Sequence, residues 1–186
     1  MKARRVKHFD TDMPLADAAE RIVAVRLAEL CDLAAQAQEP AAVAALHDTR
    51  IAAKRLRYVL EITAPCFGPY AETATKRTKE LQDLLGEVHD CDVMLPRLDA
   101  LRWRTRERDA AYLVGTAGAA EPPNAAAYRG LERLAVELTA RRANLFHQWL
   151  IMWRDLQRKG FRARLEHAIR ERPVKEVEEE PQTSTV

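Results

Sequence analysis

Glycine and aromatic residues are scarce in this sequence. Its 186 residues include six Gly, and Phe, Trp and Tyr together make up 6%. Alanine is the commonest residue, and Leu, Arg and Glu fill much of the remainder. Because these residues favour helices, the composition predicts an all-α fold and argues against all-β and α/β folds. A chain of this length can build a core without disulfides or a structural metal.

Cysteines and long apolar runs are also few. The three cysteines, Cys31, Cys66 and Cys91, include one without a partner and show no C-x-x-C spacing. This indicates reduced thiols and no disulfide framework. No stretch approaches 18 uncharged apolar residues, and the first residues lack the apolar segment of a signal peptide. We therefore expect a cytoplasmic protein that does not span a membrane.

The charges are unevenly distributed along the chain. Thirty Lys and Arg against 28 Asp and Glu give a net charge of +2. Residues 173–186 hold four Glu and one Lys, a net of −3, which leaves +5 for residues 1–172. We predict a basic flexible arm over 1–12, one helical domain over 13–172 and an acidic disordered tail over 173–186. Clustered basic residues in the domain are compatible with a polyanionic partner.

Helical periodicity and Pro/Gly positions predict the boundaries of the helices. Asp12 is a candidate cap for the first helix, Pro40 fits the first turn of the second, and Asn124 is a candidate cap for the fourth long one. Pro96 is expected to stop or kink the third helix, with a shorter basic helix after it. The predicted fold is an antiparallel bundle of about four long helices plus short ones. The predicted long helices span 15–37, 40–63, 70–95 and 125–156.

The second predicted helix carries a cationic stripe. At about 100° per residue, five polar side chains fall within an arc of about 80°, and apolar residues occupy the opposite side. Stacked like charges cost a few tenths of a kcal/mol per pair, so acids from a neighbouring helix or an anionic ligand must offset them. The stripe comprises His47, Arg50, Lys54, Arg57 and Glu61.

Two other predicted helices carry charges that bear on how the like charges of this stripe are offset. The third predicted helix is basic near its start, at Lys76 and Lys79, and acidic further on. The fourth carries Arg141 and Arg142, the latter in line with its apolar stripe. One interpretation is that the polar faces form interhelical ion pairs or are simply solvated. The other is that the cations converge on a shared anion site, to which Arg brings planar forks and Lys a compact charge.

Two motifs resemble a known family, the conserved histidine α-helical domain, or CHAD. The first is His47-x-x-Arg50-x-x-x-Lys54-Arg55-x-Arg57-Tyr58, and the second runs from Leu81 to Val93 as LQDLLGEVHDCDV. The resemblance is dense over residues 46–98 and thinner elsewhere. It implies an all-helical domain that binds inorganic polyphosphate and has no catalytic activity or cofactor of its own. The implied phosphate contacts are His47, Arg50, Lys54, Arg57, Lys76, Lys79 and Arg141 or Arg142, with Arg55 as an outer contact.

The resemblance carries one departure and some further expectations. Members of the family usually contain two related four-helix halves, whereas this chain has one His-x-x-Arg helix. A single set of helices is either a complete module or pairs with a second copy, so a homodimer is one expectation. A polyphosphate binder in the cytoplasm would also be expected at polyphosphate granules.

Other functions remain open from the residues alone. The same stripe would attract nucleic acid nonspecifically, although no nucleic-acid-binding motif is present. A metal-dependent phosphohydrolase would need clustered carboxylates, for which the candidates are Glu80, Asp83, Glu87 and Asp90. A metal site could draw on His47, His89, Asp90, Cys91 and Asp92, with Glu61 or Glu87, but their spacings match no tight zinc pattern. A pure interaction bundle is the remaining alternative, in which the charges serve only helix pairing.

Overall fold

All the regular secondary structure in the described part of the chain is helical. The computed structural model describes residues 2–7, 10, 12–116 and 121–171, and this part contains no strand. The predicted all-α class and antiparallel packing are confirmed. The elements are α1 (Leu15–Gln36), α2 (Val43–Thr63), the short 3₁₀ helix η1 (Ala64–Cys66), α3 (Tyr70–Gly115), α4 (Ala125–Arg158) and α5 (Phe161–Ala168).

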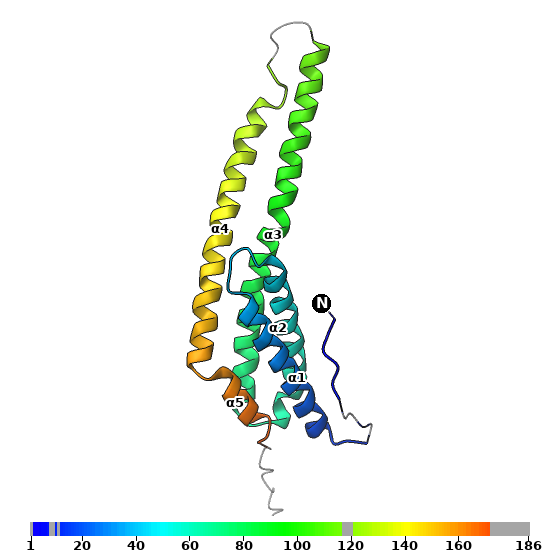
Figure 1. Cartoon of the computed structure of the whole chain (residues 1–186), viewed down its shortest axis with the longest axis vertical. Coiled ribbons are helices and arrows are strands. Elements are labelled where there is room, and N and C mark those ends of the chain that lie inside the picture. The colour runs from blue at the N-terminus through cyan, green and yellow to red at the C-terminus, as the bar shows by residue number, and fades with distance from the viewer. Residues whose placement is uncertain (1, 8–9, 11, 117–120, 172–186) are drawn as a thin grey trace, which may run out of the picture.

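The helices make a bundle from which a long hairpin protrudes. α1, α2 and the first half of α3 pack side by side, α4 lies against α3, and α5 closes the lower end (Figure 1). The second half of α3 and the first half of α4 run on together beyond the other helices (Figure 1). The molecule therefore has a compact part and a two-helix extension.

The hydrophobic core lies in the compact part. α1 contributes a stripe of small and branched apolar residues, and α2, α3, α4 and α5 each contribute one apolar face to the same buried cluster. The indole nitrogen of Trp149 donates to the carbonyl of Ala37 at 2.9 Å, which ties α4 to the end of α1. Each fully buried leucine contributes about 1.5–3 kcal/mol of burial free energy. The most buried leucines are Leu27, Leu30, Leu56, Leu60, Leu81, Leu85 and Leu165.

Pro96 does not end the third helix. α3 continues through it as one helix of 46 residues, so the predicted break at Leu95 and the separate helix after it are wrong. Proline removes one backbone donor and crowds the preceding turn, at a cost of about 3 kcal/mol in a helix interior. Packing of α4 along both halves of α3 compensates for this local cost.

Of the two predicted helix caps, Asp12 is wrong, and Asn124 holds the N-cap position of α4 without a side-chain cap bond. α1 begins after Pro14 with no side-chain cap, so Asp12 does not cap it. Asn124 does occupy the position before α4, but its side chain donates to Asp109 of α3 and makes no cap bond. The second helix begins at Val43, three residues after the predicted start at Pro40.

The turn between α4 and α5 depends on a glycine. Gly160 has φ of 67°, in the left-handed region that side chains other than glycine rarely adopt. This turn brings Phe161 and Leu165 of α5 into the core. The backbone N–H of Gly68 donates to the carbonyl of Ala168 at 3.0 Å, which fastens the end of α5 to the start of α3.

Candidate cationic site between α2 and α3

The two histidines of the motifs meet where α2 and α3 cross. Nδ1 of His47 lies 3.3 Å from Nδ1 of His89, and the ring centroids are 4.7 Å apart. The pKa of His89 is lowered, first by burial and then by the nearby charges of His47 and Arg50, while Asp90 and Asp92 act in the opposite direction. The pair therefore favours a neutral His89 in a positive environment.

Arg50 lies one turn further along α2, against a glycine of α3. A Cβ atom on Gly86 would lie 3.8 Å from Nε of Arg50. The pairs His47–His89 and Arg50–Gly86 fix the antiparallel register, because three steps forward on α2 correspond to three steps back on α3. The same register places Lys54 opposite Gln82, and Arg57 opposite Lys79.

Lys54 and Arg57 both hold their charges beside Tyr58. Nζ of Lys54 is 5.6 Å from the ring centroid and Cζ of Arg57 is 4.6 Å from it, which is the range of cation–π attraction. Nε of Arg57 is buried and has no hydrogen-bond partner among the described residues. Its nearest carboxylate oxygen, on Glu61, is 3.6 Å away, too far for a hydrogen bond.

The two lysines of α3 stand on its exposed surface. Lys79 lies within about 20° of Gly86 around the helix and Lys76 about 80° away, at 100° per residue, and both are exposed. We name six residues the cationic seam. They are His47, Arg50, Lys54 and Arg57 of α2, and Lys79 and His89 of α3.

Arg55 points to another side of α2. Its Nη1 lies 3.2 Å from Oε1 of Glu29, a carboxylate that is only 1% exposed. Arg26 of α1 donates to the other oxygen of Glu29 at 2.6 Å, and the backbone N–H of Arg4 donates to the first at 3.2 Å. Arg55 therefore helps to join α1, α2 and the N-terminal arm. The flexibility predicted for that arm stays a prediction.

Arg141 and Arg142 are engaged by carboxylates of α3. Nη2 of Arg141 lies 2.8 Å from Oε2 of Glu87, and both side chains are exposed. Nε of Arg142 lies 2.9 Å from Oδ1 of Asp92, and its Nη2 donates to the carbonyl of Pro40 at 2.7 Å. Arg142 thus fastens α4 to the loop before α2. Contact of either arginine with phosphate stays a prediction.

The predicted site residues therefore divide into two groups. One group lies along the cationic seam with Lys76 beside it, and the other, Arg55, Arg141 and Arg142, bonds to acids elsewhere. In the described ranges no salt bridge is recorded for Arg50, Lys54, Lys76 or Lys79. Ion pairing between helices, one of the two interpretations of the polar faces, thus applies to Arg55, Arg141 and Arg142. It does not account for the other four cations, which are Arg50, Lys54, Lys76 and Lys79.

Three residues of the second motif face α2, a position that sequence reasoning did not predict. Gln82, Gly86 and His89 follow one another at four and three residues, the spacing of one helical face. The Oε1 atom of Gln82 is buried without a hydrogen-bond partner in the described residues. The spacing was readable from the sequence, but the partner helix was not, because register between helices depends on packing.

The carboxylates of α3 are dispersed. Glu80 pairs with Arg77 at 2.8 Å and Glu87 with Arg141. Across residues 2–7, 10, 12–116 and 121–171 no three His, Cys, Asp or Glu side chains gather as a metal site would require. A search of the same residues finds no helix that combines the length and apolar character needed to cross a membrane.

Comparison with known proteins gives one positive result. The family model for the CHAD domain matches residues 2–99, which cover α1, α2 and the first part of α3. No curated protein and no solved structure matches the chain significantly. The matched region includes the cationic seam and ends close to where the hairpin leaves the bundle, and it spans more than half of the sequence. The chain belongs to the CHAD domain family.

Proposed function

We propose that this protein binds inorganic polyphosphate along the cationic seam and does not catalyse a reaction on it. One observation carries the proposal. α2 and α3 bring cations to a common boundary, and no salt bridge within the described residues occupies Arg50, Lys54 or Lys79. Membership of the CHAD domain family supports it, since these domains are generally non-catalytic.

The chemistry of the seam suits a linear phosphate chain. Each internal phosphate carries about one negative charge, and a chain of identical units requires a row of cations more than a closed pocket. Arg50 and Arg57 offer guanidinium forks about 10 Å apart along α2, at 1.5 Å per residue. Lys54 adds a positive charge between these two guanidinium groups. Lys79 adds another positive charge from α3, the facing helix.

Removal of seam charges tests the proposal. We expect Arg50→Gln combined with Lys54→Gln to weaken polyphosphate binding about tenfold or more at fixed salt, with helicity unchanged by circular dichroism. The matched control is Arg129→Gln with Arg154→Gln, two exposed residues of α4 that lie on its side away from α3. Equal affinity in the seam variant and the control would overturn the proposal.

Two further assays test the alternatives. Competition with single-stranded DNA separates a polyphosphate site from a general polyanion site. At a general polyanion site, DNA would displace bound polyphosphate when the two are present at comparable concentrations of phosphate. Incubation of the protein with polyphosphate and Mg²⁺ tests for hydrolysis. Released orthophosphate that disappears in a Glu80→Gln, Asp83→Asn variant would favour the phosphohydrolase.

A further inference from the structure

The face of α3 that α2 covers becomes open further along the helix. The register places Val43, the first residue of α2, opposite Val93. Beyond this point α3 continues to Gly115 with α4 as its neighbour, and α2 is no longer beside it (Figure 1). The face that continues the cationic seam is therefore available to a ligand over the second half of α3.

Three arginines follow one another on that open face. Arg97, Arg104 and Arg108 are spaced by seven and four residues, which places them within about 40° around the helix. All three are exposed. From Met94 to Gly115 no Asp or Glu falls in the arc of these three arginines. Glu107 lies about 60° from Arg104, in line with His89, and Asp99 and Asp109 lie on other sides of α3. We name Arg97, Arg104 and Arg108 the distal arginines.

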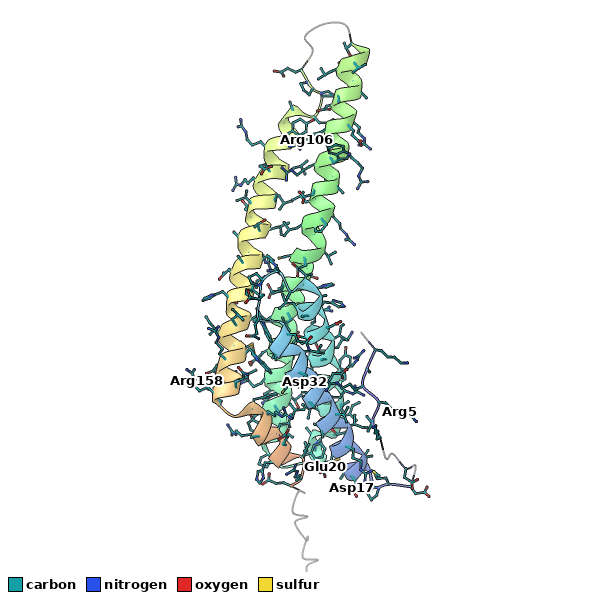
Figure 2. All side chains as sticks on the ribbon, in the orientation of Figure 1. Arg5, Asp17, Glu20, Asp32, Arg106 and Arg158 are labelled. Atoms are coloured by element: carbon teal, nitrogen blue, oxygen red, sulfur yellow. The ribbon has the colours of Figure 1, made fainter. Side chains whose placement is uncertain are left out.

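Within the described residues, the distal arginines differ from Arg102 in that no salt bridge to an acid is found for them. In the part of the chain that the structure describes, Arg104 donates only to the carbonyl of Ala100 in its own helix, at 3.3 Å. Arg102, by contrast, is held by Asp99 at 3.1 Å and by Glu132 of α4. Figure 2 shows side chains of both helices between α3 and α4 along the hairpin.

The distal arginines continue the line of the seam. Lys79, Gly86 and the three arginines all fall within the same arc of about 40° on α3. The distance from Lys79 to Arg108 along the helix is about 44 Å at 1.5 Å per residue. Asp90 is the acid in this arc between Gly86 and Arg97, and Arg141 of α4, which lines the same hollow as Asp90, interacts with its charge.

We propose that the distal arginines form a second cationic segment, which takes up the part of a long polyphosphate chain that extends past the seam. The inference rests on the proposed function and goes beyond it, because two of the three residues lie outside the region matched by the family model. A short chain fills the seam alone. A long chain engages both segments and gains the contacts of the hairpin.

Chain length provides the test. We expect Arg97→Gln, Arg104→Gln and Arg108→Gln together to weaken binding of a long-chain polyphosphate about tenfold, and to reduce the slope of log affinity against log salt by roughly two, at about 0.7 per lost phosphate contact. Affinity for tripolyphosphate should stay within about twofold of the wild type. The matched control is Arg129→Gln, Arg133→Gln and Arg154→Gln, three exposed residues on the outer side of α4.

The outcomes are distinguishable. A loss for the long chain only, absent from the control, supports the second segment. Equal affinities of the distal variant and the control, or an equal loss for tripolyphosphate, overturns it. Failure of the wild-type protein to bind either ligand would instead overturn the proposed function, and the second segment with it. Circular dichroism and light scattering confirm that each variant keeps its helicity and mass.

Discussion

Lys54 and Arg55 are neighbours in the sequence, and the structure gives their charges different surroundings. Lys54 is exposed on the seam, whereas Arg55 reaches Glu29, which also holds Arg26 and the backbone of Arg4. A buried carboxylate is stable only when such donors surround it. Glu29 is thus a structural centre, and Arg55 has a stabilising role whether or not it contacts phosphate.

Loss of Glu29 should destabilise the fold and spare the ligand site. In Glu29→Ala, Arg26 and Arg55 lose the carboxylate between them, so we expect a loss of about 3 kcal/mol in the free energy of unfolding, less than for two fully buried partners. Urea denaturation measures the change, and tripolyphosphate titration below the transition measures the site. A loss under about 1 kcal/mol would contradict this assignment.

The histidine pair makes stability and binding depend on pH in opposite ways. Because the pKa of His89 is lowered in the folded protein, the unfolded chain takes up its proton first. The stability contributed by neutral His89 is present above about pH 6.5 and is lost as the pH falls below it. A phosphate near the pair reverses this preference, since it stabilises the imidazolium form.

We therefore expect polyphosphate affinity to rise severalfold from pH 8 to pH 6 at constant ionic strength. The increase should shrink in His89→Gln, and His147→Gln, which changes an exposed histidine of α4, should behave as the wild type. Titration at both pH values measures the effect. Identical pH profiles for the wild type and His89→Gln would place the ligand away from the pair.

Gly86 offers a finer probe of Arg50. A methyl group there would make an ordinary contact with Nε of Arg50 at 3.8 Å, and alanine favours a helix over glycine by about 1 kcal/mol. Gly86→Ala should thus raise the free energy of unfolding by up to about 1 kcal/mol and leave polyphosphate affinity unchanged. Gly86→Glu places a carboxylate beside Arg50 and should weaken binding severalfold. Denaturation and titration of both variants test the register.

At the scale of the elements, a buried acid joins the two helices of the hairpin near its tip. Asp109 is 3% exposed and accepts hydrogen bonds from the hydroxyl of Tyr128 at 2.5 Å and from the side chain and backbone of Asn124 at 2.7 and 3.3 Å. Burial raises the pKa of Asp109, but these bonds outweigh it and leave that pKa below its ordinary value. The stability that this group contributes is present above about pH 4 and is lost as the pH falls through the lowered value.

Asp109→Asn should loosen the tip and leave the bundle intact. We expect backbone amides near Asp109 and Tyr128 to exchange hydrogen about tenfold faster, because the local opening becomes less costly. Amides around Leu56 and Leu81 in the core should exchange as before. Tyr128→Phe, which removes one of the three bonds, should have a smaller effect. Unchanged exchange at the tip in both variants would show that these bonds do not hold the helices together.

The elements also indicate how far sequence reasoning reaches. The apolar stripe of α1 and the loop before α4 were predictable, because periodicity and Gly/Pro positions are local signals. The continuation of α3 through Pro96 was not, because the compensating contacts come from α4. The stripe on α2 was visible as a pattern. Which of its neighbouring cations pair with acids depended on the buried position of Glu29 and on the approach of Asp92 to Arg142, neither of which the pattern contains.

At the scale of the whole molecule, the core and the hairpin are separable. The buried cluster has no member between Cys91 and Leu145 among the described residues. Replacement of residues 101–132 by a four-residue Gly/Ser linker should therefore leave a cooperatively folding bundle. Helix axes lie 8–10 Å apart in such packing, and four residues reach about 13 Å.

The shortened protein should melt within a few degrees of the wild type, as measured by calorimetry. It should bind tripolyphosphate as the wild type does, since the seam is untouched, and long chains less tightly. Loss of a single cooperative transition would contradict the separation of core and hairpin.

The length of α3 affects how the molecular mass of the protein in solution can be determined. This helix alone is about 69 Å long at 1.5 Å per residue, whereas a compact domain of 186 residues has a radius of gyration of about 16 Å. An elongated monomer of 21.1 kDa experiences more hydrodynamic drag than a sphere of equal mass. It therefore elutes early from a size-exclusion column, with an apparent mass closer to that of a dimer. Light scattering, which measures mass independently of shape, is therefore the method that tests the homodimer expected from the sequence.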